Sequence, residues 1–197
     1  MYIKPLKNYE AYVMRQNDRS HSNDSWNFFL NDLRINSCPS NYNFLDIGCR
    51  NPVVLSNLYD IGFKNVYGID IGENATIHWK NLPFKNNLKK YDIHDGIPFD
   101  LTFHVILMSH VLEHLFDPFL CIKLIKDKLV KKGYVYCIIP YETEENIHLN
   151  HTEECPNPHY VAFTNNEDHK NFWIENGFNV LYELSTDTQS RLLLQKI

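Results

Sequence analysis

The pattern of apolar and polar residues predicts strands that alternate with helices from residue 43 onward. The segments that read as strands are Phe44–Ile47, Val66–Ile71, Lys90–His94, Phe103–Ser109, Tyr134–Ile139, Phe178–Leu184 and Arg191–Gln195, of which the third is the weakest. A helix is predicted over Val53–Tyr59. Strands alternating with helices predict an α/β fold with a mostly parallel sheet, and the Ser/Thr/Asp turn between the last two strands predicts an antiparallel hairpin.

Two further helices are predicted from the residues at their ends. Asp117–Pro118 opens a helix that runs to about Val130, because Asp caps the first turn and proline lacks an N–H that would be unpaired there anyway. Thr164–Glu167 has the form of a capping box before a helix that ends near Asn176. Gly177 follows, as expected just beyond a helix end.

The first part of the chain predicts a separate helical extension. An amphipathic stretch at Ser25–Ile35 lies within polar surroundings, and its apolar residues recur at helical spacing: Trp26, Phe29, Leu30 and Leu33. We expect an N-terminal extension over 1–39 and a main domain over 40–197. Because the apolar stripe needs a partner surface, the extension is expected to cover the active site; the alternative is a helix packed on the far side of the sheet.

Composition narrows the class of protein. The 197 residues fit one globular domain, with 44% apolar and 22% charged residues. A net charge of −5 argues against a broad nucleic-acid surface. No apolar run approaches the ~20 residues that span a bilayer, and the N-terminus lacks the apolar core of a signal peptide. Five cysteines without a C-x-x-C motif favour reduced thiols in a cytoplasmic protein; the oligomeric state stays open.

Acidic residues mark the ends of the first two predicted strands. Ligands of such sheets bind beyond the carboxyl ends of the strands, at the switch point beside the first strand. Asp70 lies 24 residues beyond Asp46, close to where an acidic residue meets the ribose hydroxyls of an adenosine ligand. Both carboxylate oxygens can accept hydrogen bonds from a cis diol. A ligand role is therefore favoured over that of simple turn residues.

Five motifs occur in a fixed order along the chain: LDIGCR, YGIDI, YDIHDGIPFD, SHVLEHLFDP and GYVYCIIP. Their order and spacing resemble those of class I S-adenosylmethionine (SAM)-dependent methyltransferases, in the large subgroup that methylates small molecules. The resemblance covers about Asn43 to Ile197. It implies a Rossmann-like seven-stranded sheet with helices on both faces, SAM as methyl donor, and a hydroxyl or amine of a sugar, lipid or natural-product intermediate as acceptor.

The resemblance also assigns roles by position. Gly48 would let the backbone pass close to the methionine part of SAM, and Asp46 would steady that loop and the ammonium group. Asp70 would hold the ribose hydroxyls, with Ile71 beside it in the cofactor site.

The third and fourth strands supply the remaining cofactor contacts that the resemblance implies. Asp92 would accept from the adenine amino group, although the nearby Asp95 is an alternative, and Ile93 would offer its backbone N–H to the ring. Ser109 and His110 would line the methionine and methyl end.

The first loop departs from the family pattern. Arg50 stands where a second glycine is usual, and Pro52 follows. A pyrophosphate needs close backbone approach at that position, so the side chain argues against a dinucleotide and a nicotinamide-dependent oxidoreductase. The Arg50 guanidinium is expected to bind the methionine carboxylate through two parallel hydrogen bonds; the alternative is a surface position.

Histidines are the candidate bases for removing a proton from the acceptor, since imidazole titrates near neutral pH. His110 is the first candidate. His151 and His159 come next, because the Thr143–Ala162 segment follows the fifth strand and is long enough to form a lid.

Two alternatives stay open. His110-x-x-Glu113-His114 resembles, in part, the metal-binding stretch of small-RNA 3′-end and some quinone O-methyltransferases, in which a Glu takes the place of His110. Further ligands could come from His148, His151, Cys155 and His159, but Pro156 and Pro158 prevent one helical face through all four, and ordinary loop histidines without a metal are favoured. The other alternative is a non-catalytic SAM-binding protein that kept the fold.

Overall fold

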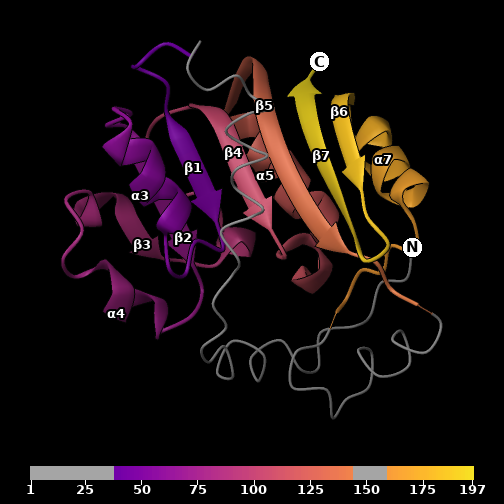
Figure 1. Ribbon diagram of the computed structural model, residues 1–197, viewed down its shortest axis with the longest axis horizontal. Coiled ribbons are helices and arrows are strands. Elements are labelled where there is room, and N and C mark those ends of the chain that lie inside the picture. Colours follow the sequence, from indigo (N-terminus) through magenta and orange to yellow (C-terminus); the bar gives the residue numbers. More distant parts are fainter. Residues whose placement is uncertain (1–37, 144–158) are drawn as a thin grey trace.

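The computed structural model describes residues 38–143 and 159–197, which form one seven-stranded sheet with the strand order β3-β2-β1-β4-β5-β7-β6 (Figure 1). The strands are β1 (Phe44–Ile47), β2 (Val66–Asp70), β3 (Leu88–Lys90), β4 (Phe103–Ser109), β5 (Leu129–Pro140), β6 (Phe178–Ser185) and β7 (Gln189–Lys196). Strands β1 to β5 pair in parallel, whereas β7 pairs antiparallel with both β5 and β6. The predicted fold class is confirmed.

Helices cover both faces of the sheet. The α-helices are α3 (Val53–Asp60), α4 (Ala75–Trp79), α5 (Pro118–Lys128) and α7 (Asn166–Glu175), and short 3-10 turns lie at η2 (Lys85–Asn87), η3 (Ile93–Asp95) and η4 (Leu112–His114). Helices α3 and α4 pack their apolar side chains into one buried cluster, and α5 and α7 pack theirs into another across the sheet (Figure 1).

The central strands are buried on both sides, which explains why their sequences are apolar without alternation. All four residues of β1 are buried, and Asp46 is 4% exposed. A carboxyl group in the middle of such a strand costs stability, so its presence in β1 indicates a functional role.

The third strand lies earlier than the pattern predicts. Instead of Lys90–His94, the structure has a strand over Leu88–Lys90, and a 3-10 turn begins at Ile93. The Asp92 side chain accepts a hydrogen bond from the backbone N–H of His94. Such local bonds compete with the extended backbone and end the strand.

The ends of two other elements also differ from the prediction. β5 starts at Leu129 and not at Tyr134, because a break in register places Leu129 opposite Phe103 and Tyr134 opposite Val105. The capping box at Thr164–Glu167 is wrong. Asn165 is the N-cap of α7, and its side chain accepts from the backbone N–H of Asp168.

Other predictions meet the structure only in part. The 1–39 extension lies almost entirely outside the described residues, and its covering role stays a prediction. Among the residues that the structure describes, no helix is long and apolar enough to cross a membrane. None of the described cysteines, which are Cys38, Cys49, Cys121 and Cys137, forms a disulfide with another of them.

Candidate active site

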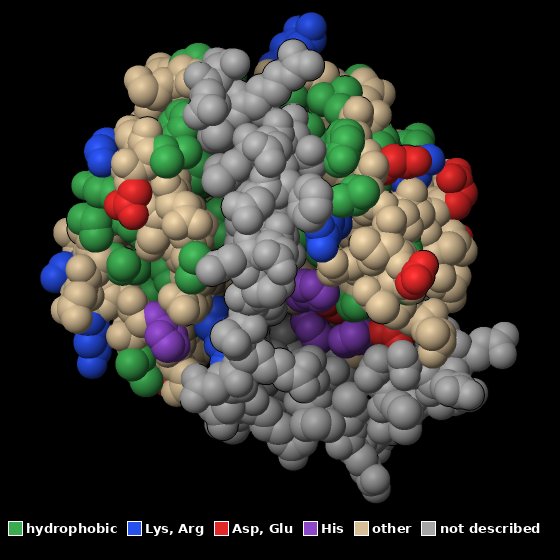
Figure 2. Space-filling model, in the orientation of Figure 1, with side chains coloured by type: hydrophobic (Ala, Val, Ile, Leu, Met, Phe, Trp, Pro, Cys, Tyr) green, Lys and Arg blue, Asp and Glu red, His purple; other side chains and the backbone are tan. Residues whose placement is uncertain are grey.

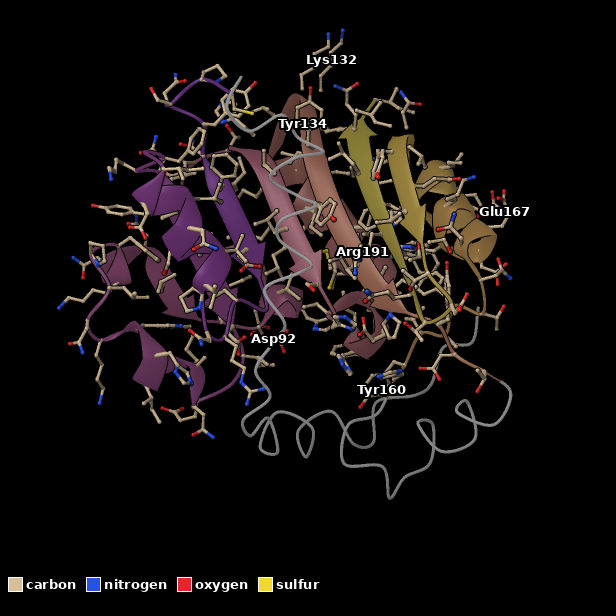
Figure 3. All side chains as sticks on the ribbon, in the orientation of Figure 1. Asp92, Lys132, Tyr134, Tyr160, Glu167 and Arg191 are labelled. Carbon is tan, nitrogen blue, oxygen red and sulfur yellow. The ribbon has the colours of Figure 1, made fainter. Side chains whose placement is uncertain are left out.

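A cavity opens at the carboxyl ends of β1, β2 and β4 and holds about 620 Å³, including space open to solvent. It is lined by Ile47, Gly48, Arg50, Ile69, Asp70, Ile71, Tyr91, Asp92, Ile93, Ser109, His110, Val111 and Leu115. Figure 3 shows Asp92 and Tyr160 at this end of the sheet, whereas Lys132 and Tyr134 lie at the opposite end.

Most of the predicted cofactor residues meet in this cavity. Those that line it are Gly48, Arg50, Asp70, Ile71, Asp92, Ile93, Ser109 and His110. Asp46 is not part of the lining and lies buried in β1 behind it. His159 does not line the cavity and lies beside Glu113 and His114. His151 lies outside the described residues.

The first loop needs a glycine at Gly48 for two reasons. Its φ of +77° lies in the left-handed region, and an added Cβ would stand 2.4 Å from Cγ2 of Val111. The backbone N–H groups of Gly48 and Cys49 both donate to the carbonyl of Ile69, which holds the loop against β2. The predicted close approach of backbone to the cavity therefore has a steric basis.

Asp70 fixes the loops on both sides of the cavity. Its Oδ2 accepts from the backbone N–H of Arg50 at 2.9 Å, and its Oδ1 accepts from that of Gly72 at 2.7 Å. An ionised carboxylate has about four lone-pair sites, so each oxygen can accept a further bond from a ligand hydroxyl.

Arg50 occupies a backbone conformation that favours glycine. Its φ is +25°, and its carbonyl accepts from the indole Nε1 of Trp79 at 2.8 Å. An arginine therefore stands here in a backbone conformation that glycine adopts more readily. Bonds to Asp70 and Trp79 offset the cost of the left-handed backbone.

The buried carboxyl group of Asp46 lies close to that of Asp70, which lines the cavity. Burial raises the pKa of Asp46 well above its usual range, and the neighbouring Asp70 raises it further. Burial also raises the pKa of Asp70, against the opposing effect of the bonds from Gly72 and Arg50. A cation placed nearby would favour the ionised form of both groups, so this end of the sheet is suited to a positively charged ligand.

At the β3 side of the cavity, Asp92 is held by a residue that the sequence analysis did not single out. His94 donates its backbone N–H to Asp92 Oδ1 at 2.9 Å, and its Nδ1 lies 2.7 Å from the same oxygen. The side chain of His94 is 5% exposed. Its place within the YDIHDGIPFD motif is the signal that could have found it.

His110 lies at the end of β4 beside a buried carboxylate. Its Nδ1 is 3.5 Å from Oε1 of Glu113, and its φ is +54°. Burial lowers the pKa of His110, but the hydrogen bond and charge of Glu113, with a further bond to Gln189, raise it more, so the net pKa is above its usual value. His110 and Glu113 are arranged like a general base whose ring is oriented by a neighbouring carboxylate.

Glu113 also lies beside two further histidines. Its Oε1 is 3.8 Å from Nε2 of His114, and the ring centroids of His114 and His159 are 4.7 Å apart. His159 in turn pairs with Glu142 through Nδ1. Figure 2 shows histidine and acidic side chains gathered at this end of the molecule.

Glu113 is an unusual buried anion. Burial raises its pKa, but the hydrogen bond from His110 and the charges of His114, His110 and His159 lower it to about 2. Its Oε2 is buried and finds no hydrogen-bond partner among the described residues. Glu142 was missed by the sequence analysis, although it follows the carboxyl end of β5 as the other site residues follow their strands.

Known proteins resemble this chain in sequence pattern and in fold. Residues 19–183 match a family model described as a methyltransferase domain. No curated protein matches the chain.

Solved structures share the fold at low identity. A SAM-dependent methyltransferase from Clostridium acetobutylicum has 14% identity and a TM-score of 0.69, with 90% of this chain and 93% of that chain covered. Magnesium protoporphyrin IX methyltransferase from Synechocystis, with bound S-adenosylhomocysteine, has 14% identity, a TM-score of 0.66, and coverage of 96% and 94%. The [4+2]-cyclase SpnF has 13% identity, a TM-score of 0.68, and coverage of 92% and 84%. These likenesses establish the fold, and the cyclase among them shows that this fold alone does not determine the reaction.

Proposed function

This chain belongs to the class I SAM-dependent methyltransferases, and from that premise we propose that it moves the methyl group of SAM to a hydroxyl or amine of a small molecule. The observation that best supports the proposal is His110, a histidine that lines the cavity and is backed by the buried carboxylate of Glu113.

The cavity residues fit the parts of SAM. Asp70 would hold the ribose hydroxyls, Asp92 and Ile93 the adenine, and the Gly48 turn the methionine part. The buried carboxyl of Asp46 lies behind that turn and would favour the ammonium group. These carboxylates together suit a ligand that carries positive charge on both its sulfonium and its ammonium.

When bound, SAM supplies a methyl carbon already activated by the sulfonium. The acceptor oxygen or nitrogen would form a bond to that carbon while the carbon–sulfur bond broke and left its electron pair on sulfur. His110 would take the acceptor's proton at Nε2, because Nδ1 faces Glu113. The protein's contribution is alignment, exclusion of water and removal of this proton.

The experiment that tests this function combines binding with turnover. SAM and S-adenosylhomocysteine should raise the melting temperature, and NAD should not. Tritium-labelled methyl should pass from SAM to members of a panel of phenols, sugars and amines. His110→Asn keeps the Nδ1-like atom facing Glu113 and tolerates the positive φ, but it lacks Nε2, so it should bind SAM normally and lose on the order of 10²-fold or more in transfer rate.

The wild-type transfer rate should rise with pH through the raised pKa of His110, since the base must be unprotonated. Stabilisation by SAM without transfer to any of the panel would favour the non-catalytic alternative. Stabilisation by NAD in place of SAM would overturn the function.

A second prediction concerns Arg50, whose guanidinium we expect to bind the methionine carboxylate of SAM. Both Arg50→Gly and Arg50→Ala should weaken S-adenosylhomocysteine binding by about tenfold, as expected for a lost charged hydrogen bond. Both should leave methylthioadenosine, which lacks the carboxylate, almost unchanged. Calorimetric titration of the two ligands measures this.

The glycine variant separates charge from backbone shape, because glycine suits the φ of +25° at this position. If only Arg50→Ala weakens binding, or if both ligands weaken equally, Arg50 shapes the loop. If neither ligand responds, Arg50 is a surface residue.

A second candidate function is metal-assisted methyl transfer, and the cluster beside His110 favours it. Glu113, His114 and His159 each offer one ligand atom, and these atoms all lie within 4.8 Å of one another. In a tetrahedral site with metal–ligand distances of ~2.1 Å, neighbouring ligand atoms stand about 3.4 Å apart. Small side-chain movements would therefore bring these three ligand atoms into position around one ion. The buried Oε2 of Glu113 has no hydrogen-bond partner among the described residues, so it is a carboxylate oxygen that a bound cation would stabilise.

The donor chemistry of this cluster selects the metal. Two imidazoles and one carboxylate suit Zn²⁺, Mn²⁺ or Fe²⁺ better than Mg²⁺, which prefers oxygen ligands and water. Glu142 would orient the His159 ring through Nδ1, as carboxylates do behind many ligating histidines. A bound ion would supply Lewis-acid polarisation of an acceptor oxygen next to His110.

Metal analysis tests this candidate independently of turnover. The wild-type chain should bind about one Mn²⁺ or Zn²⁺ by equilibrium dialysis, and His114→Asn should lose at least tenfold in affinity with the loss of one of three ligands. His78→Asn, which changes an exposed histidine on α4, is the matched control and should bind normally. A wild-type chain that binds no metal, or equal affinity in both variants, would remove this candidate.

A further inference from the structure

His94 makes a set of contacts that connects the cavity to the start of α5. Its ring stacks on Phe116, with ring centroids 3.7 Å apart and an interplanar angle of 10°. Its Nε2 accepts a hydrogen bond from the backbone N–H of Asp117 at 3.4 Å. Asp117 is the N-cap of α5 and accepts from Leu120 through its side chain. The ring is therefore held on one face and at one nitrogen.

These contacts determine which nitrogen of His94 carries the proton. A backbone N–H can donate only to an unprotonated ring nitrogen, so the bond from Asp117 places a lone pair on Nε2. In the neutral ring the proton then resides on Nδ1. Nδ1 lies 2.7 Å from Oδ1 of Asp92 and donates to it.

Two donors from one residue thus converge on a single oxygen. Oδ1 of Asp92 accepts from both the backbone N–H and the Nδ1–H of His94. These bonds favour the ionised form of the Asp92 carboxylate. They also prevent the group from rotating about its Cβ–Cγ bond, which would exchange the two oxygens. An ionised carboxylate only accepts hydrogen bonds and cannot donate.

We propose that His94 is a positioning residue that makes Asp92 a fixed acceptor and so selects a 6-amino purine over a 6-oxo purine in the cofactor site. This inference rests on the proposed function, in which Asp92 reads the adenine end of SAM. A 6-amino group donates to the carboxylate, whereas a 6-oxo group presents a second acceptor to it and leaves two acceptors face to face. A carboxyl group free to rotate and to take up a proton would tolerate both.

The test compares S-adenosylhomocysteine with S-inosylhomocysteine, which differs in the 6-oxo group. Two amide variants form a matched pair. His94→Asn places its amide nitrogen where Nδ1 was and can still donate to Asp92. His94→Gln reaches the Nε2 position and can still accept from Asp117, but it loses the donor to Asp92. The affinities of both ligands are measured by calorimetry for all three proteins.

The wild-type protein should prefer the adenosyl ligand by at least about tenfold, the size of one well-placed charged hydrogen bond. His94→Asn should keep this ratio, and His94→Gln should reduce it to threefold or less, a change of about 0.7 kcal/mol or more. An unchanged ratio in both variants overturns the inference. If the affinity ratio falls equally in both variants, His94 acts through its packing on Phe116, and the inference is overturned as well.

A measurement on the wild-type protein covers the case in which the variants do not fold. Nitrogen-15 chemical shifts distinguish the two neutral tautomers of histidine. The inference requires His94 to be protonated at Nδ1, and protonation at Nε2 alone contradicts it. If the wild-type chain binds no S-adenosylhomocysteine at all, the proposed function fails and not this inference.

Discussion

The bonds that the Asp70 carboxylate accepts from the backbone of Arg50 and Gly72 hold the site together. They tie the loop after β1 to the loop after β2, and the cavity lies between these loops. One end of this tie is the backbone N–H of Arg50, whose φ of +25° lies in the left-handed region. Because the Asp70 side chain both holds these loops and lines the cavity, the folding of this edge of the sheet is coupled to ligand binding.

Buried negative charge is the second constraint, and it costs stability in the empty protein. Asp46 and Asp70 lie close enough that the charge of one raises the pKa of the other, and Glu113 stays ionised although buried because histidines surround it. Such groups persist where a cation or a proton transfer uses them. In the proposed function, the carboxyl groups of β1 and β2 would favour the charged part of SAM, and Glu113 would orient His110 as the base.

The sequence was sufficient for the order and type of the strands because each strand is a buried apolar run between clear turn residues. Phe44–Ile47 and Phe103–Ser109 were placed to the residue. The third strand was misplaced because the bond from His94 to Asp92 is local chemistry that apolar patterning does not report. The parallel-sheet rule brought Asp70, Asp92 and His110 to one edge correctly, since the carboxyl ends of parallel strands meet there.

What the sequence could not supply was the set of contacts between segments far apart in the chain. Glu142 and His159 meet across a segment outside the described residues, and His94 meets Asp117 across β4. Neither spacing nor periodicity encodes these pairs, because they depend on how loops pack after the sheet has formed.

Calorimetric titration of SAM into Asp70→Ala tests whether the Asp70 carboxylate anchors both the loops and the cofactor. We expect a loss on the order of 1.5–3 kcal/mol of binding free energy, the value of charged hydrogen bonds to the ribose hydroxyls, with the fold retained by circular dichroism. Unchanged affinity in a folded Asp70→Ala protein would contradict it.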